Sequence, residues 1–79
     1  EKSMNKQRRK EVEEITTQMQ DLRDRLEAVM DEEQDSYDNL PESFQSGERG
    51  ETMQEAIDNL GSALDSIHEA LDYAQSAIE

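Results

Sequence analysis

The sequence contains no cysteine and no tryptophan, and only three of its 79 residues are aromatic. No disulfide can therefore support the small hydrophobic core that a chain of this length builds. The sequence also lacks an apolar run long enough to cross a bilayer, and it shows no signal-peptide pattern. It begins with Glu1 rather than methionine, so we expect further residues before it in the native protein. These features predict one small domain over residues 1–79, with no membrane as its partner.

Basic side chains are scarce over most of the chain. The 21 acids and eight lysines and arginines give a formal net charge of −13. Five of the eight basic residues lie between residues 2 and 10, so residues 11–79 contain only Arg23, Arg25 and Arg49. Such an acidic body repels nucleic acids and anionic lipids. The charge therefore excludes nucleic acid as a partner and favours a protein with a basic surface.

Residues that carry catalytic chemistry are also missing. The sequence has no nucleophile–base pair, no glycine-rich phosphate loop and no zinc-binding spacing. The single histidine, His68, has Asp65 three residues before it and Asp72 four residues after it, so the three can form a carboxylate–imidazole face. The helical phase places His68 at the edge of an apolar stripe and both acids outward, which favours a solvated histidine. We expect no enzymatic activity, no cofactor and no metal site.

Residues 31–42 offer an alternative metal site, a calcium loop. Its ligand positions are filled by Asp31, Glu33, Asp35, Asn39 and Glu42. A calcium loop needs glycine at its sixth position for a sharp turn, and this sequence has Ser36 there. Pro41 also precedes the final acid. The first half of the segment is therefore better explained as the last turns of a helix.

The second half of the chain repeats every seven residues. In residues 56–79 an alanine is followed by isoleucine or leucine and then by an acid, four times in succession. Apolar residues at alternating steps of three and four are typical of a helix that packs like a coiled coil. This pattern predicts a helix over about residues 48–78. The residues expected to mediate self-association are Ala56, Ile57, Leu60, Ala63, Leu64, Ile67, Ala70 and Leu71.

A first helix is predicted over about residues 3–37, with a narrower apolar stripe. Its members are Val12, Ile15, Met19, Leu22, Leu26 and Val29. The connection, about residues 38–47, is rich in turn formers, and Pro41 can begin a single helical turn within it. Ser46 is the expected N-cap of the second helix. Leu40 and Phe44, with Tyr37, are expected to close the end of the core. Gly61, inside the second helix, predicts close approach of another backbone.

A connection this short makes the two helices antiparallel neighbours. This arrangement is expected to place basic residues 2–10 beside Asp65, Glu69, Asp72 and Glu79. One hairpin leaves the alanine stripe of the second helix uncovered, and a second hairpin would cover it. The sequence thus predicts an all-α fold: an antiparallel two-helix hairpin with coiled-coil-like heptads that forms a homodimeric four-helix bundle.

Seven acids of the second helix are expected to point outward along one face. They are Glu48, Glu51, Glu55, Asp58, Asp65, Glu69 and Asp72, and we call them the acidic ridge. One interpretation of the ridge is a solvated face that keeps a small protein soluble. The other is imitation of DNA phosphates, so that the ridge occupies the basic cleft of a nucleic-acid enzyme.

The segment 31–60 resembles a group of short, acidic, uncharacterised proteins encoded by bacteriophages and prophages. The resemblance is carried by the DEEQ run, the YDNLPES turn, the SGERGE start of the second helix and the alanine–aliphatic–aspartate repeat after it. The group offers no settled activity and no functional residues to transfer. The resemblance implies a phage or prophage gene whose product acts in the bacterial cytoplasm, where small acidic proteins of this kind often bind and block host enzymes.

Two functions follow as hypotheses. The first is an acidic protein-binding module that occupies the basic surface of a host protein and inhibits it. The alternative is a purely structural protein, a helical bundle that associates with itself or scaffolds an assembly.

Overall fold

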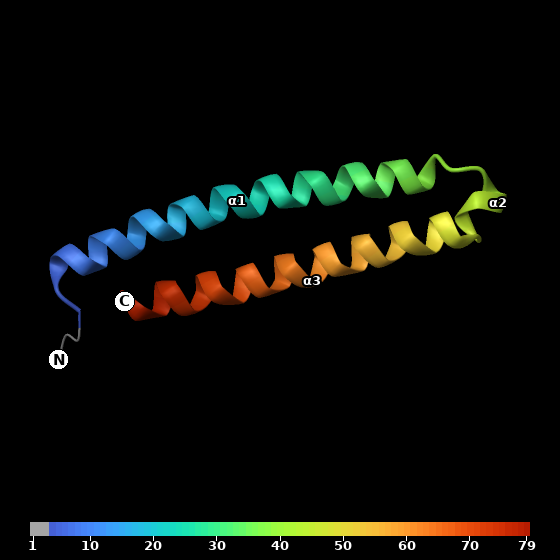
Figure 1. The fold of residues 1–79 in the computed structure, drawn as a ribbon. Helices are drawn as coiled ribbons and strands as arrows, with labels where there is room; N and C mark the ends of the chain where they lie inside the picture. The colour runs from blue at the N-terminus through green and yellow to red at the C-terminus, as the bar shows by residue number, and fades with distance from the viewer. Residues whose placement is uncertain (1–3) are drawn as a thin grey trace.

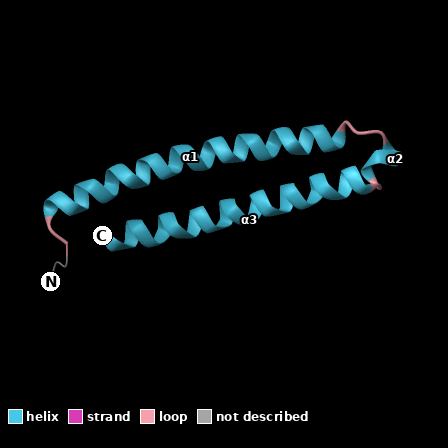
Figure 2. Cartoon of the chain, in the orientation of Figure 1, coloured by secondary structure: helices cyan, strands magenta, loops and turns pink. Residues whose placement is uncertain are grey.

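The computed structural model describes residues 4–79, which form two long helices and one short one (Figure 1). Helix α1 spans Lys6–Asp38, α2 spans Glu42–Gln45 and α3 spans Glu48–Ala77. No strand occurs within this range (Figure 2). Helices α1 and α3 pack side by side in opposite directions, and the Cα trace measures 61 × 17 × 12 Å. The predicted helical hairpin is confirmed.

Side chains satisfy backbone groups at the open end of the hairpin. Helix α1 begins at Lys6 rather than near residue 3, which lies outside the described residues. The Oδ1 atom of Asn5 accepts a hydrogen bond from the backbone N–H of Arg8 at 2.8 Å and so caps the helix. The Arg9 guanidinium donates to the carbonyl of Ile78, one of the unpaired carbonyls at the end of α3. This contact joins the two ends.

The register of the hairpin differs from the expected one. Arg9 meets Ile78, whereas Asp72 lines a groove with Gln20 and Asp24. Asp65 lines another groove with Glu27 and Met30. Since the two long helices have similar lengths and the turn between them is short, the basic segment aligns with the last residues of α3 and not with Asp65–Asp72. Lys2, also expected there, lies outside the described residues.

Helix α2 folds the chain back within a few residues. The carbonyl of Pro41 accepts hydrogen bonds from the backbone N–H groups of Phe44, at 2.9 Å, and Gln45, at 3.1 Å. The predicted helical turn after Pro41 is therefore confirmed. The Gln45 side chain donates to the carbonyls of Tyr37, at 3.0 Å, and Asp38, at 3.4 Å. Gln45 thus satisfies carbonyls at the end of α1 and fixes α2 against it.

Two expectations about the connection are wrong. Gly47, not Ser46, is the N-cap of α3, because the Ser46 hydroxyl already donates to carbonyls within the α2 turn. Phe44 does not close the core, since 52 % of it is exposed. Tyr37 and Leu40 are half-buried.

Two glycines of α3 stand in opposite environments. Gly50 is buried, and a Cβ placed there would lie 2.5 Å from the carbonyl carbon of Gln45 and 2.7 Å from its Cα. These are backbone atoms, so α2 approaches the first turn of α3 too closely for any other residue. A Cβ at Gly61 would meet no atom within 4 Å. The close approach expected at Gly61 within the hairpin is therefore found at Gly50 instead.

The two glycines give a matched pair of substitutions. We expect Gly50→Ala to lower the free energy of unfolding by about 1–3 kcal/mol, the typical cost of overpacking. We expect Gly61→Ala to raise it by up to about 1 kcal/mol, because alanine stabilises a helix interior relative to glycine. Thermal unfolding followed by circular dichroism measures both. Equal effects of the two changes, or stabilisation by Gly50→Ala, would contradict the packing of α2 on α3.

Candidate functional site

Helix α3 turns its predicted apolar stripe toward α1. The stripe advances in steps of three and four, and all its members are half-buried except Leu71, which is 6 % exposed. They are Met53, Ile57, Leu60, Leu64, Ile67, Leu71, Ala74 and Ile78. No other apolar side chain among residues 4–79 is as buried as Leu71. The hairpin therefore encloses a core one residue wide along each helix.

Helix α1 is rotated relative to its predicted orientation. Val12, Met19 and Leu26 are half-buried as expected, but Ile15 is 47 % exposed, Leu22 53 % and Val29 51 %. The positions facing α3 in their place are Thr16, Arg23 and Met30. Both stripes follow steps of three and four and share the same three residues. Periodicity alone therefore does not decide which flank of α1 meets α3.

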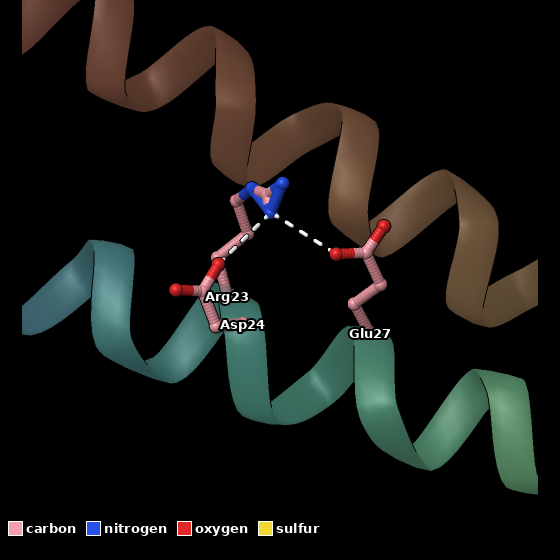
Figure 3. A network of polar contacts seen from close by, with 3 residues as sticks. All are labelled: Arg23, Asp24 and Glu27. Atoms are coloured by element: carbon pink, nitrogen blue, oxygen red, sulfur yellow. Dashed lines mark hydrogen bonds and ion pairs between the residues drawn. The ribbon is translucent and has the colours of Figure 1, made fainter.

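The polar side chains drawn into the interface are satisfied locally. Thr16 is 7 % exposed, and its hydroxyl donates to the carbonyl of Glu13 at 2.8 Å. The Arg23 side chain keeps 30 % of its surface exposed, and its Nη1 atom lies 3.2 Å from Asp24 and 3.5 Å from Glu27 (Figure 3). The Arg23 stem can thus cover apolar surface while its charge stays paired at the edge.

The rotation of α1 leaves an apolar surface on one flank of the hairpin. Leu22, Leu26 and Val29 of α1 line a groove together with Ile67 of α3, and Arg25 borders it. Two alanines of α3 extend this surface, because residues four before and three after Ile67 share its helix face. We call this surface the outer apolar face. Its members are Ile15, Leu22, Val29, Ala63, Ile67 and Ala70.

The residues expected to mediate self-association divide between two surfaces. Ile57, Leu64 and Leu71 belong to the stripe that packs against α1 of the same chain. Ile67 lies at the border between that stripe and the outer apolar face, and Leu60 occupies the equivalent position one heptad earlier. Ala56 and Ala63 are half-buried and Ala70 is exposed. The alanines thus stand beside the core of the hairpin rather than within it.

All seven members of the acidic ridge are exposed. Among residues 4–79, no lysine or arginine lies within 4 Å of any of these seven carboxylates. Asp58, Asp65 and Asp72 recur every seven residues, which places them about 10.5 Å apart along α3. The ridge is therefore a row of exposed carboxylates that form no ion pair with a lysine or arginine of residues 4–79.

The candidate metal ligands do not converge. His68 is an exposed boundary residue, as predicted, with Nε2 3.9 Å from Oδ2 of Asp72. Residues 31–38, the first part of the alternative calcium loop, are helical, as the favoured interpretation required. Within residues 4–79, no three histidine or acidic side chains cluster so as to hold a metal ion. No helix in this range is both long and apolar enough to span a membrane.

The unpaired carboxylates of the ridge are expected to make the melting temperature depend on salt. Like charges along the ridge repel one another, and salt screens this repulsion. At a fixed protein concentration and pH 7.5, raising KCl from about 0.02 M to about 0.5 M, which shortens the Debye length several-fold, should raise the melting temperature. The increase should be about 4 °C or more, equivalent to about 1 kcal/mol.

The triple variant D58N/D65N/D72N, which removes three ridge charges, serves as the control. It should melt at a higher temperature than the wild type in low salt and respond less to KCl. A wild-type melting temperature that salt leaves unchanged or lowers would show that attractive ion pairs outweigh repulsion.

Comparison with known proteins places the chain in no family: no protein-family model, no curated protein and no solved structure matches it.

Proposed function

We propose that the protein is an acidic binding module whose ridge occupies the basic surface of another protein. The observation that carries this proposal is the exposure of all seven ridge carboxylates with no lysine or arginine within 4 Å of them in residues 4–79. Unpaired surface charges keep their full attraction for an opposite charge and speed the encounter with it.

The resemblance to phage and prophage proteins extends the proposal to a setting. The partner is then a protein of the bacterial host cytoplasm, and binding inhibits it by covering its basic surface. A nucleic-acid enzyme has such a surface where it holds phosphates. The ridge carries seven charges over 25 residues, or about one per 5 Å of helix, compared with about 3.4 Å per phosphate along one DNA strand. Mimicry of DNA is therefore the narrower form of the proposal.

Capture from a bacterial lysate tests the ridge. Immobilised wild-type chain should retain a partner at about 0.1 M salt and release it as the Debye length falls at higher salt. The variant D58N/D65N/D72N should bind that partner about tenfold more weakly, since three exposed charge pairs contribute about 0.5 kcal/mol each. Retention of the partner by this variant at wild-type strength would refute the ridge as the binding surface.

Helix α1 supplies a matched control. Asp24, Asp31 and Asp38 also recur every seven residues and are exposed. The variant D24N/D31N/D38N removes the same number of charges, at the same seven-residue spacing, from α1 instead of α3. It should retain the partner. Equal loss in both variants would show that net charge, and not the ridge, attracts the partner. Release of the partner by duplex DNA would support mimicry, and resistance to DNA would exclude it.

The second candidate function, a purely structural self-associating bundle, is favoured by a different observation. The outer apolar face exposes about half of Ile15, Leu22 and Val29 to water. Apolar contacts respond weakly to salt, whereas contacts of the acidic ridge weaken steeply. An assembly of this chain alone that persists in about 0.5 M salt would therefore support the structural role.

A further inference from the structure

We propose that a second copy of this chain covers the outer apolar face, packed antiparallel about a two-fold axis that passes beside Leu22. This inference is independent of the acidic ridge, because it uses another flank of the hairpin. It also specifies the arrangement of the copies, which the heptad pattern of α3 does not reveal. Three observations support it: the amount of exposed surface, the placement of the apolar row of α1 and the distribution of charge.

The first observation is the accessible surface. The chain exposes 6148 Å² and has a mass of 9.1 kDa. A folded monomer of this mass exposes about 4900 Å² on average. The surplus is on the order of 1200 Å², and a standard protein interface buries about 800 Å² on each partner. The hairpin therefore has enough surplus surface to form one such interface, and its exposed isoleucine, leucine and valine lie on one flank.

The second observation is that the apolar row of α1 is symmetric about Leu22. Leu22 lies seven residues from Ile15 and seven from Val29, and it lines the same groove as Val29 and Ile67. A two-fold axis across the helices at Leu22 brings this row onto its counterpart in the second copy.

The resulting contacts are complementary in size. Leu22 meets Leu22 of the second copy, and Ile15 meets Val29. On the α3 side, Ala70 lies near this axis, because His68 and Leu71 share a groove with Arg23 and Asp24, and its small side chain allows the two α3 helices to approach closely. Each contact away from the axis appears twice, as an isologous interface requires, and the Leu22 contact on the axis appears once. One symmetry axis thus pairs the large residues of α1 and brings Ala70 of each copy close to the second α3 helix.

The third observation is charge, which selects between two possible axes. An axis along the helices would place both acidic turns at the same end. An axis across the helices places the basic end of each copy beside the turn of the other. Residues 6–10 contain four basic side chains, whereas residues 31–51 contain eight acids and one arginine. Opposite charges meet only with the axis across the helices, so electrostatics favours the antiparallel arrangement.

Arg8 continues the apolar row of α1 with a positive charge. Arg8 lies seven residues before Ile15 and is exposed, so it continues the row to the basic end. The same row ends at Ser36 on the other side, among Glu32, Glu33 and Asp35. In the antiparallel dimer, Arg8 of each copy lies against this acidic group of the other. With the axis along the helices, α1 packs against α3 of the second copy, and Arg8 does not reach it.

Cysteine crosslinking tests the axis. Under mild oxidation, Leu22→Cys should form a covalent dimer through a disulfide on the two-fold axis, with helicity unchanged. Asp24→Cys is the matched control, since Asp24 is two residues away and lines the groove of the opposite flank with His68. It should stay monomeric in denaturing gels. Mixed chains carrying Leu22→Cys and Ala70→Cys that crosslink to each other, with no Leu22 homodimer, would establish the other axis and overturn the proposal.

Sedimentation equilibrium tests the dimer without crosslinking. The wild type should be a dimer at micromolar concentration, and Leu22→Glu should raise the dissociation constant about a hundredfold or more, because a central apolar anchor is lost from both copies. Arg8→Glu should raise it about tenfold in low salt, equivalent to about 1.4 kcal/mol over two symmetric contacts. Lys10→Glu makes the same charge change off the apolar row and should have a smaller effect. A wild-type monomer at about 100 µM, far above the dissociation constant of a specific dimer, or equal effects of the two charge reversals, would refute the arrangement.

Discussion

The packing of α1 against α3 is the interaction on which the rest of the structure depends, and it is limited to one stripe per helix. Two helices share a single interface, so neither can bury a second face within the hairpin. Leu71 is therefore the most buried apolar side chain among residues 4–79. The remaining apolar and acidic surfaces follow from this limit. Side chains of α3 that do not pack against α1 must face water or another molecule.

The tight turn determines how the two stripes align. Gln45 satisfies the carbonyls of Tyr37 and Asp38, and Gly50 allows the Gln45 backbone to lie on the first turn of α3. These two residues are therefore committed to the geometry of the turn, while the outward-facing residues are where function must be sought.

The sequence predicted α3 better than α1, for a physical reason. In α3 the apolar residues form a wide, unbroken band, and its centre has to face the partner helix. In α1 the residues Val12, Met19 and Leu26 are shared by two possible stripes, one completed by Ile15 and Leu22, the other by Thr16 and Arg23. Burying Thr16 costs little once its hydroxyl bonds to Glu13, and Arg23 keeps its charge at the edge beside two carboxylates. Hydrophobicity alone ranks these stripes wrongly, because it ignores local satisfaction of polar groups.

Of the two candidate surfaces, only the acidic ridge could be predicted from the sequence. The acidic ridge follows from heptad phase, because charged residues opposite an apolar band must be solvated. The outer apolar face does not follow from the heptad phase, because it depends on the rotation of α1 relative to α3. Likewise, the role of Gly50 depends on how closely α2 approaches α3, which the sequence does not reveal. Gly61 is also a glycine of α3, yet a Cβ placed there would meet no atom within 4 Å.

The two candidate surfaces use different heptad positions, so both can be occupied at the same time. The ridge occupies positions on α3 that point away from α1, whereas the outer apolar face uses the alanines beside the core. Closing the apolar face with a second antiparallel copy would therefore leave both ridges exposed and running in opposite directions. A partner with two basic sites would then bind two ridges at once, and the second contact would form at a high effective concentration. Weak exposed charge pairs become sufficient for stable binding under these conditions. Self-association and partner binding are thus compatible functions of one hairpin, and dimerisation would strengthen the binding that each ridge supports alone.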